Sequence, residues 1–394
     1  MLWAMNNGRF VFAQLLDFLP LHEFRKCVER YDGNCRIRSF SCWDQFLCMA
    51  FGQLTSCRSL REVTTCLRAK GYRLYHVGIR GQISRSTLAD ANETRDWRIY
   101  ADFAAILIAQ ARRLYSDQRP LPGFDQIVYA FDSTTIDLCL KLFPWAKFRR
   151  RKSAVKLHTL LDIRGDIPCF VLITAGKVAD VKALDVLLIE AGAFYILDRG
   201  YVDFARLYRF TTHVAYFVTR AKRAMRYRTK EVRPVDAGTG VRSDKLIRLC
   251  GVNTSHYYPS LLRRIVYFDL KLNRRFVFLS NHLELPAITI CELYRRRWRV
   301  ELFFKWIKQN LRVKAFYGYS PNAVKTQIWI AVGVYALVLI LRKELGIAQR
   351  SPSDLLQILG VSLFEKEPLL LDFFEESFEA GKQPDYNQLS LFDL

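Results

Sequence analysis

Residues 294–308 read YRRRWRVELFFKWIK, and this stretch sets the position of a helix and of a candidate site. Four of its polar residues stand at offsets of 0, 3, 7 and 14, so at about 100° per residue they share a stripe about 60° wide; they are Tyr294, Arg297, Glu301 and Lys308. The neighbouring stripe is apolar and must face the core. The polar stripe therefore lies at the edge of the core, as a site would, although a solvated face joined by salt bridges has the same pattern.

Two aspartates upstream add further carboxylates. Residues 127–131, 155–163, 169–174 and 194–197 predict strands and residues 182–191 predict a helix, which together indicate an α/β core. Asp132 and Asp198 each sit at the carboxyl end of a predicted strand, where open sheets present functional groups, although such an Asp is also a common turn or N-cap residue. With Glu301 they form a set that could hold two Mg²⁺ ions about 3.5–4 Å apart on a phosphodiester substrate.

The composition indicates a polyanionic partner. The 394 residues hold 60 Lys and Arg against 38 Asp and Glu, a net charge of +22. A few units of net charge suffice for solubility, so nucleic acid or an anionic membrane surface is the expected partner. The longest uncharged apolar run, residues 328–341, is too short to span a membrane and predicts a buried core helix. We expect no membrane span and no secretory signal, and hence a cytosolic protein.

The N-terminal region predicts helices with basic ends. Three capping patterns mark helix starts between residues 1 and 120: Ser41 with Asp44, Ser59 with Glu62, and Thr87 with Asp90. Arginine and lysine residues lie near the helix ends, as in a helical DNA-binding module. A basic helical bundle with no role in nucleic-acid binding has the same features.

The aspartates and the stripe also carry a family resemblance. Asp132 lies in YAFDSTTIDL, Asp198 lies in ILDRGYVD, and the stripe has the form Y-x2-R-x3-E-x6-K. Over roughly residues 120–345 the chain resembles the DDE transposases of bacterial insertion sequences with the YREK signature. The resemblance implies an RNase H-like mixed-sheet core interrupted by a β-rich insertion. We therefore expect five parts: a helical DNA-binding domain (1–120), the first part of the core (121–212), the insertion (213–288), the second part of the core with the YREK helix (289–350), and a C-terminal helical and acidic tail (351–394).

The resemblance also implies roles for single residues. Asp132, Asp198 and Glu301 would be catalytic and bind Mg²⁺, with Mn²⁺ as a substitute. Tyr294, Arg297 and Lys308 would hold phosphates of the transposon end, the arginine by planar bidentate contact and the lysine as a point charge. Arg220 and Lys222, in FVTRAK, match a basic pair that approaches the DNA end; an ordinary basic loop would look the same.

A basic run close to the first aspartate is a candidate DNA contact. A basic run that includes Arg149, Arg150 and Arg151 follows Asp132 closely and is expected to contact the DNA backbone, although charge runs are usually solvated faces.

Relatives that form hairpin ends stack a flipped base on an aromatic side chain of the insertion, often Trp. No Trp lies between residues 199 and 297, so Tyr257 or Tyr258 would have to serve, or the cleavage follows another route.

The C-terminal end has the opposite charge. Residues 363–394 hold eight acidic residues and two lysines, or −6, so the rest of the chain carries +28. This end is a solvated tail or a shield for the basic surface. It also contains QLSLF at residues 388–392, which resembles the peptide by which bacterial replication and repair proteins dock on the sliding clamp; the contacting residues would be Gln388, Leu389, Leu391 and Phe392.

These observations favour a cut-and-paste transposase. It would bind terminal inverted repeats of double-stranded DNA, cleave at the element ends, and join 3′-hydroxyl ends to target DNA; the family implies a homodimer on DNA. An RNase H-like nuclease or resolvase without strand transfer is the enzymatic alternative, and a DNA-binding relative without catalysis is the other. The YREK stripe argues against the first, and the presence of all three acids argues against the second.

Overall fold

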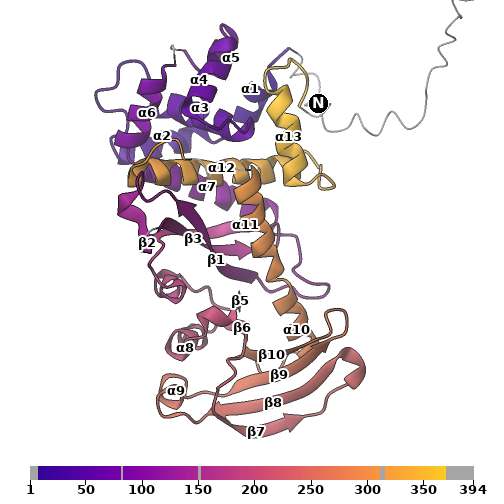
Figure 1. Cartoon of the computed structure of the whole chain (residues 1–394). Helices are drawn as coiled ribbons and strands as arrows, with labels where there is room; N and C mark the ends of the chain where they lie inside the picture. Colours follow the sequence, from indigo (N-terminus) through magenta and orange to yellow (C-terminus); the bar gives the residue numbers. More distant parts are fainter. Residues whose placement is uncertain (1–7, 81–82, 150–151, 311–315, 370–394) are drawn as a thin grey trace, which may run out of the picture.

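A single mixed sheet runs through most of the molecule. The computed structural model describes residues 8–80, 83–149, 152–310 and 316–369. Its ten-stranded sheet has the order β2-β3-β1-β5-β6-β10-β9-β8-β7, and β4 also pairs with β3. Figure 1 shows helices gathered at one end of the molecule and β7–β10 at the other. The expected mixed sheet with helices is therefore confirmed.

The strands nearest the helices form the part of the sheet that carries Asp132 and Asp198, the two aspartates of the candidate site. β1 pairs antiparallel with β3 and parallel with β5, and β5 pairs parallel with β6. The bounds are β1 Val128–Leu138, β2 Lys147–Arg149, β3 Lys152–Asp162, β4 Ile167–Ala175, β5 Phe194–Leu197 and β6 Tyr216–Arg220.

Alternation along these strands builds a core on each face of the sheet. Val128 and Ala130 of β1 belong to one buried cluster, whereas Tyr129 and Phe131 belong to the other. Successive strand residues point to opposite faces, so both faces must be apolar when both are covered. Helix α8 (Phe204–Thr212) contributes Phe210 to the second cluster.

Strands β7 to β10, which lie in the range expected for the insertion, extend this sheet. β10 (Arg274–Ser280) pairs with β6 and with β9 (Leu262–Asp269), and β8 (Val241–Leu249) joins β9 to β7 (Tyr227–Arg233). A short helix, α9 (Val252–Tyr257), interrupts the strands. Strand β6 lies within the expected insertion range but is the parallel neighbour of β5. The five-part domain division stays a prediction.

The N-terminal helices pack with the C-terminal ones into one helical body (Figure 1). It contains α1 Val11–Leu16, α2 Leu21–Arg30, α3 Cys42–Leu54, α4 Leu60–Ala69, α5 Arg73–His76, α6 Arg85–Thr94, α7 Arg98–Leu114, α12 Pro321–Glu344 and α13 Pro352–Ser362. Ser41 and Asp44 form the expected capping box, and Ser59 caps α4. The prediction of Thr87 as an N-cap is wrong: Ser84 caps α6 and accepts the N–H of Thr87, since the helix starts three residues earlier.

Helix α12 is the central element of the helical body. It packs against α7, α3 and α6, and also against β4 of the sheet. It is long and apolar enough to cross a membrane by those two measures, yet 89% of its most apolar window is buried inside the protein. The run of residues 328–341 is thus part of a buried core helix, as its sequence predicts.

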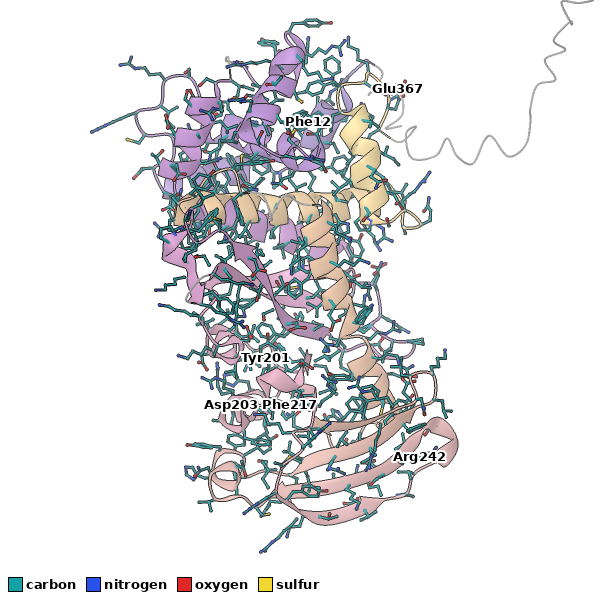
Figure 2. The ribbon with its side chains drawn as sticks, viewed as in Figure 1. Phe12, Tyr201, Asp203, Phe217, Arg242 and Glu367 are labelled. Carbon is teal, nitrogen blue, oxygen red and sulfur yellow. The ribbon has the colours of Figure 1, made fainter. Side chains whose placement is uncertain are left out.

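The chain end described by the structure is tied to its beginning. Backbone N–H groups of Val11 and Phe12 donate to the carbonyls of Glu365 and Leu363, and the buried Gln14 side chain bonds the backbone of Glu367 and Leu369. Figure 2 shows Phe12 and Glu367 at the same end of the molecule. Residues 363–369 are therefore part of the helical body.

Three local expectations are corrected by the structure. Asp132 is the fifth residue of the eleven in β1, because pairing with β3 continues to Leu138. Residues 182–191 are not an α-helix; a 3₁₀ segment, Asp180–Val186, is followed by irregular chain. The stripe at residues 294–308 spans two helices, α10 (Ala287–Arg295) and α11 (Trp298–Asn310).

A buried ion pair holds the extended sheet to the chain that leads into α10. Arg263 of β9 pairs with Asp244 of β8 at 2.6 Å, with both side chains almost fully buried, and also donates to the carbonyls of Leu283 and Leu285. A buried guanidinium deprived of its carboxylate is strongly destabilising.

We therefore expect Asp244→Ala to lower the free energy of unfolding by about 3–5 kcal/mol in urea denaturation followed by circular dichroism. Glu231→Ala, which removes the more exposed partner of Arg233, is the matched control and should cost less than about 1 kcal/mol. Equal effects of the two substitutions would show that the buried pair has no special part in stability.

Candidate functional site

The register of the parallel strands brings the first two aspartates together. Phe131 of β1 pairs with Leu197 of β5, and Leu197 pairs with Thr219 of β6. Each chain then advances one residue, to Asp132, Asp198 and Arg220. Parallel neighbours at the same level point to the same face and lie about 4.8 Å apart, so these three side chains form a row across the sheet. Arg220 donates to Asp198 at 2.8 Å.

Helix α11 brings the third carboxylate to the same face. It packs against β1 and carries Glu301 in its first turn. Arg297 donates to Asp132 at 2.9 Å and also to Glu301, so one guanidinium joins the two carboxylates. Tyr294 donates to Asp198 at 3.3 Å. Six of the residues chosen from the sequence thus meet at one place: Asp132, Asp198, Arg220, Tyr294, Arg297 and Glu301.

A tight turn between α10 and α11 orients Arg297. The backbone N–H groups of Arg299 and Val300 donate to the carbonyls of Arg296 and Arg297, three residues back instead of four. Such a turn narrows the helix locally and changes its direction. Tyr294 and Glu301 nevertheless reach the same site from the two helices.

The carboxylates differ in their electrostatic surroundings. Burial raises the pKa of Asp132 to about 6, against the Ser133 N–H and Arg297, which lower it; the charges of Asp198 and Glu301 raise it further. Burial also acts to raise the pKa of Asp198, but the Arg199 backbone N–H and Arg220 outweigh it, so that pKa falls below its ordinary value. The charges of Asp198 and Glu301 therefore both act on the carboxyl of Asp132.

An apolar pocket of about 400 Å³ adjoins the arginine of the site. Tyr294, Arg297 and Trp298 line it from the helix side, and Tyr267, Phe276 and Phe278 line it from β9 and β10. Burial raises the pKa of Tyr294 to about 12, so this hydroxyl stays protonated near neutral pH. Trp298 is 59% exposed and was not selected from the sequence, because the spacing argument followed only the polar stripe.

The remaining DNA-binding candidates lie further out. Lys308 lies on α11 and is half-buried, while Arg149 is exposed on β2. Lys222 donates to the carbonyl of Val202 at 2.7 Å. The other candidates lie outside the described residues: Arg150, Arg151, Gln388, Leu389, Leu391 and Phe392.

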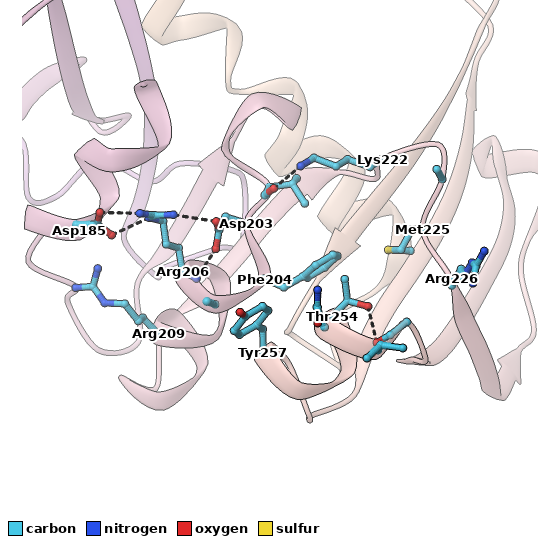
Figure 3. Close-up of a pocket in the computed structure, with 16 residues that line it drawn as sticks. Asp185, Asp203, Phe204, Arg206, Arg209, Lys222, Met225, Arg226, Thr254 and Tyr257 are labelled. Carbon is cyan, nitrogen blue, oxygen red and sulfur yellow. Dashed lines mark hydrogen bonds and ion pairs between the residues drawn. The ribbon is translucent and has the colours of Figure 1, made fainter. Parts of the chain in front are cut away.

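A larger cleft lies beyond Lys222. It measures about 910 Å³ and is lined by α8, α9 and the chain after β6. Figure 3 shows Phe204 and Tyr257 facing it, with Arg206 held by Asp185 and Asp203. Tyr257 is 51% exposed, whereas Tyr258 is fully buried and bonds Thr211. The suggestion that Tyr258 stacks a flipped base is therefore wrong, because its ring belongs to the core.

The carboxylate oxygens of the site suit a divalent cation, but the Arg297 side chain lies between two of the carboxylates. The three carboxylates gathered here supply oxygen ligands of the kind that Mg²⁺ takes. Among the described residues no group of three or more His, Cys, Asp or Glu is near enough to hold a metal ion. Arg297 occupies one carboxylate oxygen of Asp132 and one of Glu301, so it competes with a metal ion for these oxygens.

Comparison with known proteins identifies the class. The family model described as Transposase DDE domain matches residues 123–337, more than half of the chain and the whole of this site. A model described as a domain of unknown function matches residues 7–80. The chain therefore belongs to the transposase DDE domain family and is an enzyme that acts on DNA.

Individual relatives point to insertion sequences of bacteria. The chain is 33% identical over 257 residues to a putative transposase of Sinorhizobium fredii, a match that covers 64% of this chain and 70% of the relative. It is 28% identical to a probable transposase for an insertion sequence element of Geobacillus stearothermophilus, over 64% of this chain and 66% of the relative. The protein is a DDE transposase of the bacterial insertion-sequence kind. A piggyBac transposase synaptic complex with hairpin DNA matches at 10% identity and a TM-score of 0.46, covering 97% of this chain and 84% of that chain, and supports no further conclusion.

The buried charge of Asp132 predicts a pH-dependent stability. The neutral carboxyl is favoured in the folded protein, so this stabilisation is complete below the ordinary pKa of 3.8 and is lost as the pH rises through about 6. The difference corresponds to about 3 kcal/mol. Without metal, Asp132→Asn should therefore raise the free energy of unfolding by up to about 3 kcal/mol at pH 8 and by almost nothing at pH 4.

Urea denaturation in EDTA at both pH values measures this effect. Asp137→Asn, an exposed position on the same strand, is the matched control and should change little at either pH. A gain for Asp132→Asn that is the same at both pH values would contradict the electrostatic explanation.

Proposed function

We propose that this transposase works by a cut-and-paste reaction at the ends of its element, on an RNase H-like core, and that it belongs to the YREK group. It would bind terminal inverted repeats, cleave at the element ends, and join 3′-hydroxyl ends to target DNA. The observation that carries the proposal is the meeting of Asp132, Asp198 and Glu301 around Arg297 and Arg220. Carboxylates for metal ions and arginines for phosphates are what phosphodiester chemistry needs.

Arg297 and Arg220 each have a hydrogen-bond donor that could bind a phosphate. The Nε atoms of Arg297 and Arg220 are both buried and have no hydrogen-bond partner within the described structure. A buried donor without a partner is costly, and a phosphate oxygen would satisfy it. We infer that a DNA-end phosphate draws Arg297 towards itself and so frees Asp132 and Glu301.

The freed carboxylates would then hold divalent metal. The family uses divalent metal ions, and we propose Mg²⁺, with Mn²⁺ as a substitute, at Asp132, Asp198 and Glu301. When bound, the metal would activate the attacking oxygen and stabilise the leaving one. Tyr294 keeps its proton and its bond to Asp198, and so orients that carboxylate.

Other basic residues would guide the DNA towards this centre. Lys308 and Lys222 would bind phosphates near the cut, and Arg149, Arg150 and Arg151 would bind the backbone alongside. Phosphate contacts of this type raise affinity without reading sequence. If a base is flipped during hairpin formation, Tyr257 with Phe204 in the 910 Å³ cleft is the available aromatic pair.

Two alternative functions make different predictions about the DNA products. A nuclease or resolvase on the same fold would cut but not join ends, and a non-catalytic relative would only bind. The full set of three acids with the arginines in contact favours the transposase over both. We further propose that the helical N-terminal region binds the inverted repeats, that the protein acts as a homodimer on DNA, and that it works in the bacterial cytosol or nucleoid.

The central test uses Glu301. In Mg²⁺ on DNA that carries the candidate element ends, Glu301→Gln should lower cleavage and strand transfer by about 1,000-fold, because it removes a metal ligand worth several kcal/mol. Nicked, double-strand-cut and joined products are scored separately on gels. Glu292→Gln, an exposed acid on the adjoining helix, is the matched control and should behave as wild type.

The product pattern decides among the three functions. Joined products in wild type establish a transposase. Cut products that are never joined would support the nuclease, and binding without any product would support the non-catalytic relative. Full activity of Glu301→Gln would exclude Glu301 from the site.

The C-terminal peptide is proposed to dock on the bacterial sliding clamp. Gln388, Leu389, Leu391 and Phe392 would supply the contacts, the apolar side chains filling a pocket on the clamp. Deletion of residues 388–392 should abolish pull-down of the full chain by purified clamp, while a scrambled order of the same five residues serves as control for composition. Unchanged pull-down by the deletion variant would end this proposal.

A further inference from the structure

One segment of the N-terminal helices is basic without any acidic residue. Residues 63–89 contain no Asp or Glu, yet they hold five cations: Arg68, Lys70, Arg73, Arg80 and Arg85. The segment runs from α4 through α5 to the start of α6. Local charge of one sign over such a length favours a polyanionic partner.

Two large aromatic side chains are exposed within this segment. Tyr72 is 74% exposed and Tyr75 is 65% exposed, on and beside the short helix α5. Figure 1 places α5 at the outer end of the helical body, and the insertion strands β7–β10 lie at the opposite end. Exposed tyrosines next to arginines are characteristic of binding surfaces. A tyrosine side chain gives a large contact area at low entropic cost.

The tyrosines line a recess with two of the arginines. It measures about 640 Å³, and its described lining is Arg68, Gly71, Tyr72, Leu74, Tyr75, Ile79, Arg80 and Ile83, with no acidic residue. Arg68 donates to the carbonyl of Ile83 at 2.9 Å and so holds the far wall in place. The guanidinium of Arg80 lies 5.9 Å from the centre of the Tyr75 ring.

The chemistry of this surface fits nucleic acid. Within the described residues neither Arg73 nor Arg80 forms an ion pair with a carboxylate, so both can neutralise phosphates. Aromatic faces beside guanidinium groups contact sugars and bases. The family acts on DNA, which favours DNA over an anionic membrane as the partner.

We propose that Tyr72, Arg73, Tyr75 and Arg80 form a DNA-contact surface that binds the element end at a distance from the cleavage site. The arginines would hold phosphates, and the tyrosine rings would pack against the sugars and bases. This inference rests on the proposed function and deepens it, because it assigns the contact to four residues. It also gives a role to the region that matches a domain of unknown function, residues 7–80.

The test compares two duplexes that share the cleavage site. One extends about 40 base pairs into the element, about 140 Å, and the other about 12 base pairs, about 40 Å, at 3.4 Å per base pair. Fluorescence anisotropy with the full chain measures both affinities. Tyr72→Ala with Tyr75→Ala should weaken binding of the long duplex about tenfold and leave the short one unchanged. Tyr72→Phe with Tyr75→Phe keeps the rings and should bind the long duplex nearly as wild type does.

A second variant pair tests the charges independently of the rings. Arg73→Gln with Arg80→Gln should reduce the slope of log affinity against log salt on the long duplex by about 2, one unit for each phosphate that is no longer neutralised. Thermal unfolding of each variant should match wild type, since Tyr72, Tyr75 and Arg80 are exposed and Arg73 is only half-buried. If the alanine pair unfolds, the glutamine pair decides.

Several outcomes would overturn the inference. They are wild-type affinity of both variant pairs for the long duplex, an equal loss on the two duplexes, or loss of binding to anionic phospholipid vesicles with DNA binding intact. The proposed function fails separately, if wild type produces no cut or joined DNA from element ends. A wild type that cuts and joins, with variants that bind the long duplex normally, refutes only this surface.

Discussion

The parallel pairing of β1 with β5 is the constraint on which the site depends. Phe131 opposite Leu197 sets Asp132 beside Asp198, and the same level in β6 adds Arg220. A shift of one residue would turn an aspartate to the other face, into a cluster that contains Tyr195 and Phe217. Burying an aspartate in that apolar cluster without a partner would be costly, and this cost resists such a shift. The register of the core therefore also positions the charges.

The second condition is that opposite charges accompany the gathered carboxylates. Arg297 joins Asp132 to Glu301, and Arg220 holds Asp198, so the folded chain tolerates three acids at one place. Burial still leaves Asp132 with a raised pKa. In the proposed mechanism, the cations that balance the acids are also the groups that a DNA phosphate attracts.

The arrangement of the two ends of the molecule follows from α12. This helix is buried along most of its length, and it packs both on the N-terminal helices and on β4. The helical body and the sheet thereby share one hydrophobic core. At the far end strands β7 to β10 extend the same sheet, so the proposed DNA-contact surfaces are distributed along one continuous framework.

The sequence by itself determined the residue types and their spacing. Local sequence pattern was enough to find the three acids, Tyr294, Arg297, the strand cores and the caps of α3 and α4. Such a pattern depends only on neighbours along the chain. Tertiary structure decided the rest. Pairing with β3 extends β1 past Asp132, a tight turn divides the stripe between α10 and α11, and core packing hides Tyr258 while leaving Trp298 exposed. Contacts between segments that are distant in the sequence set these features, so the local sequence pattern does not predict them.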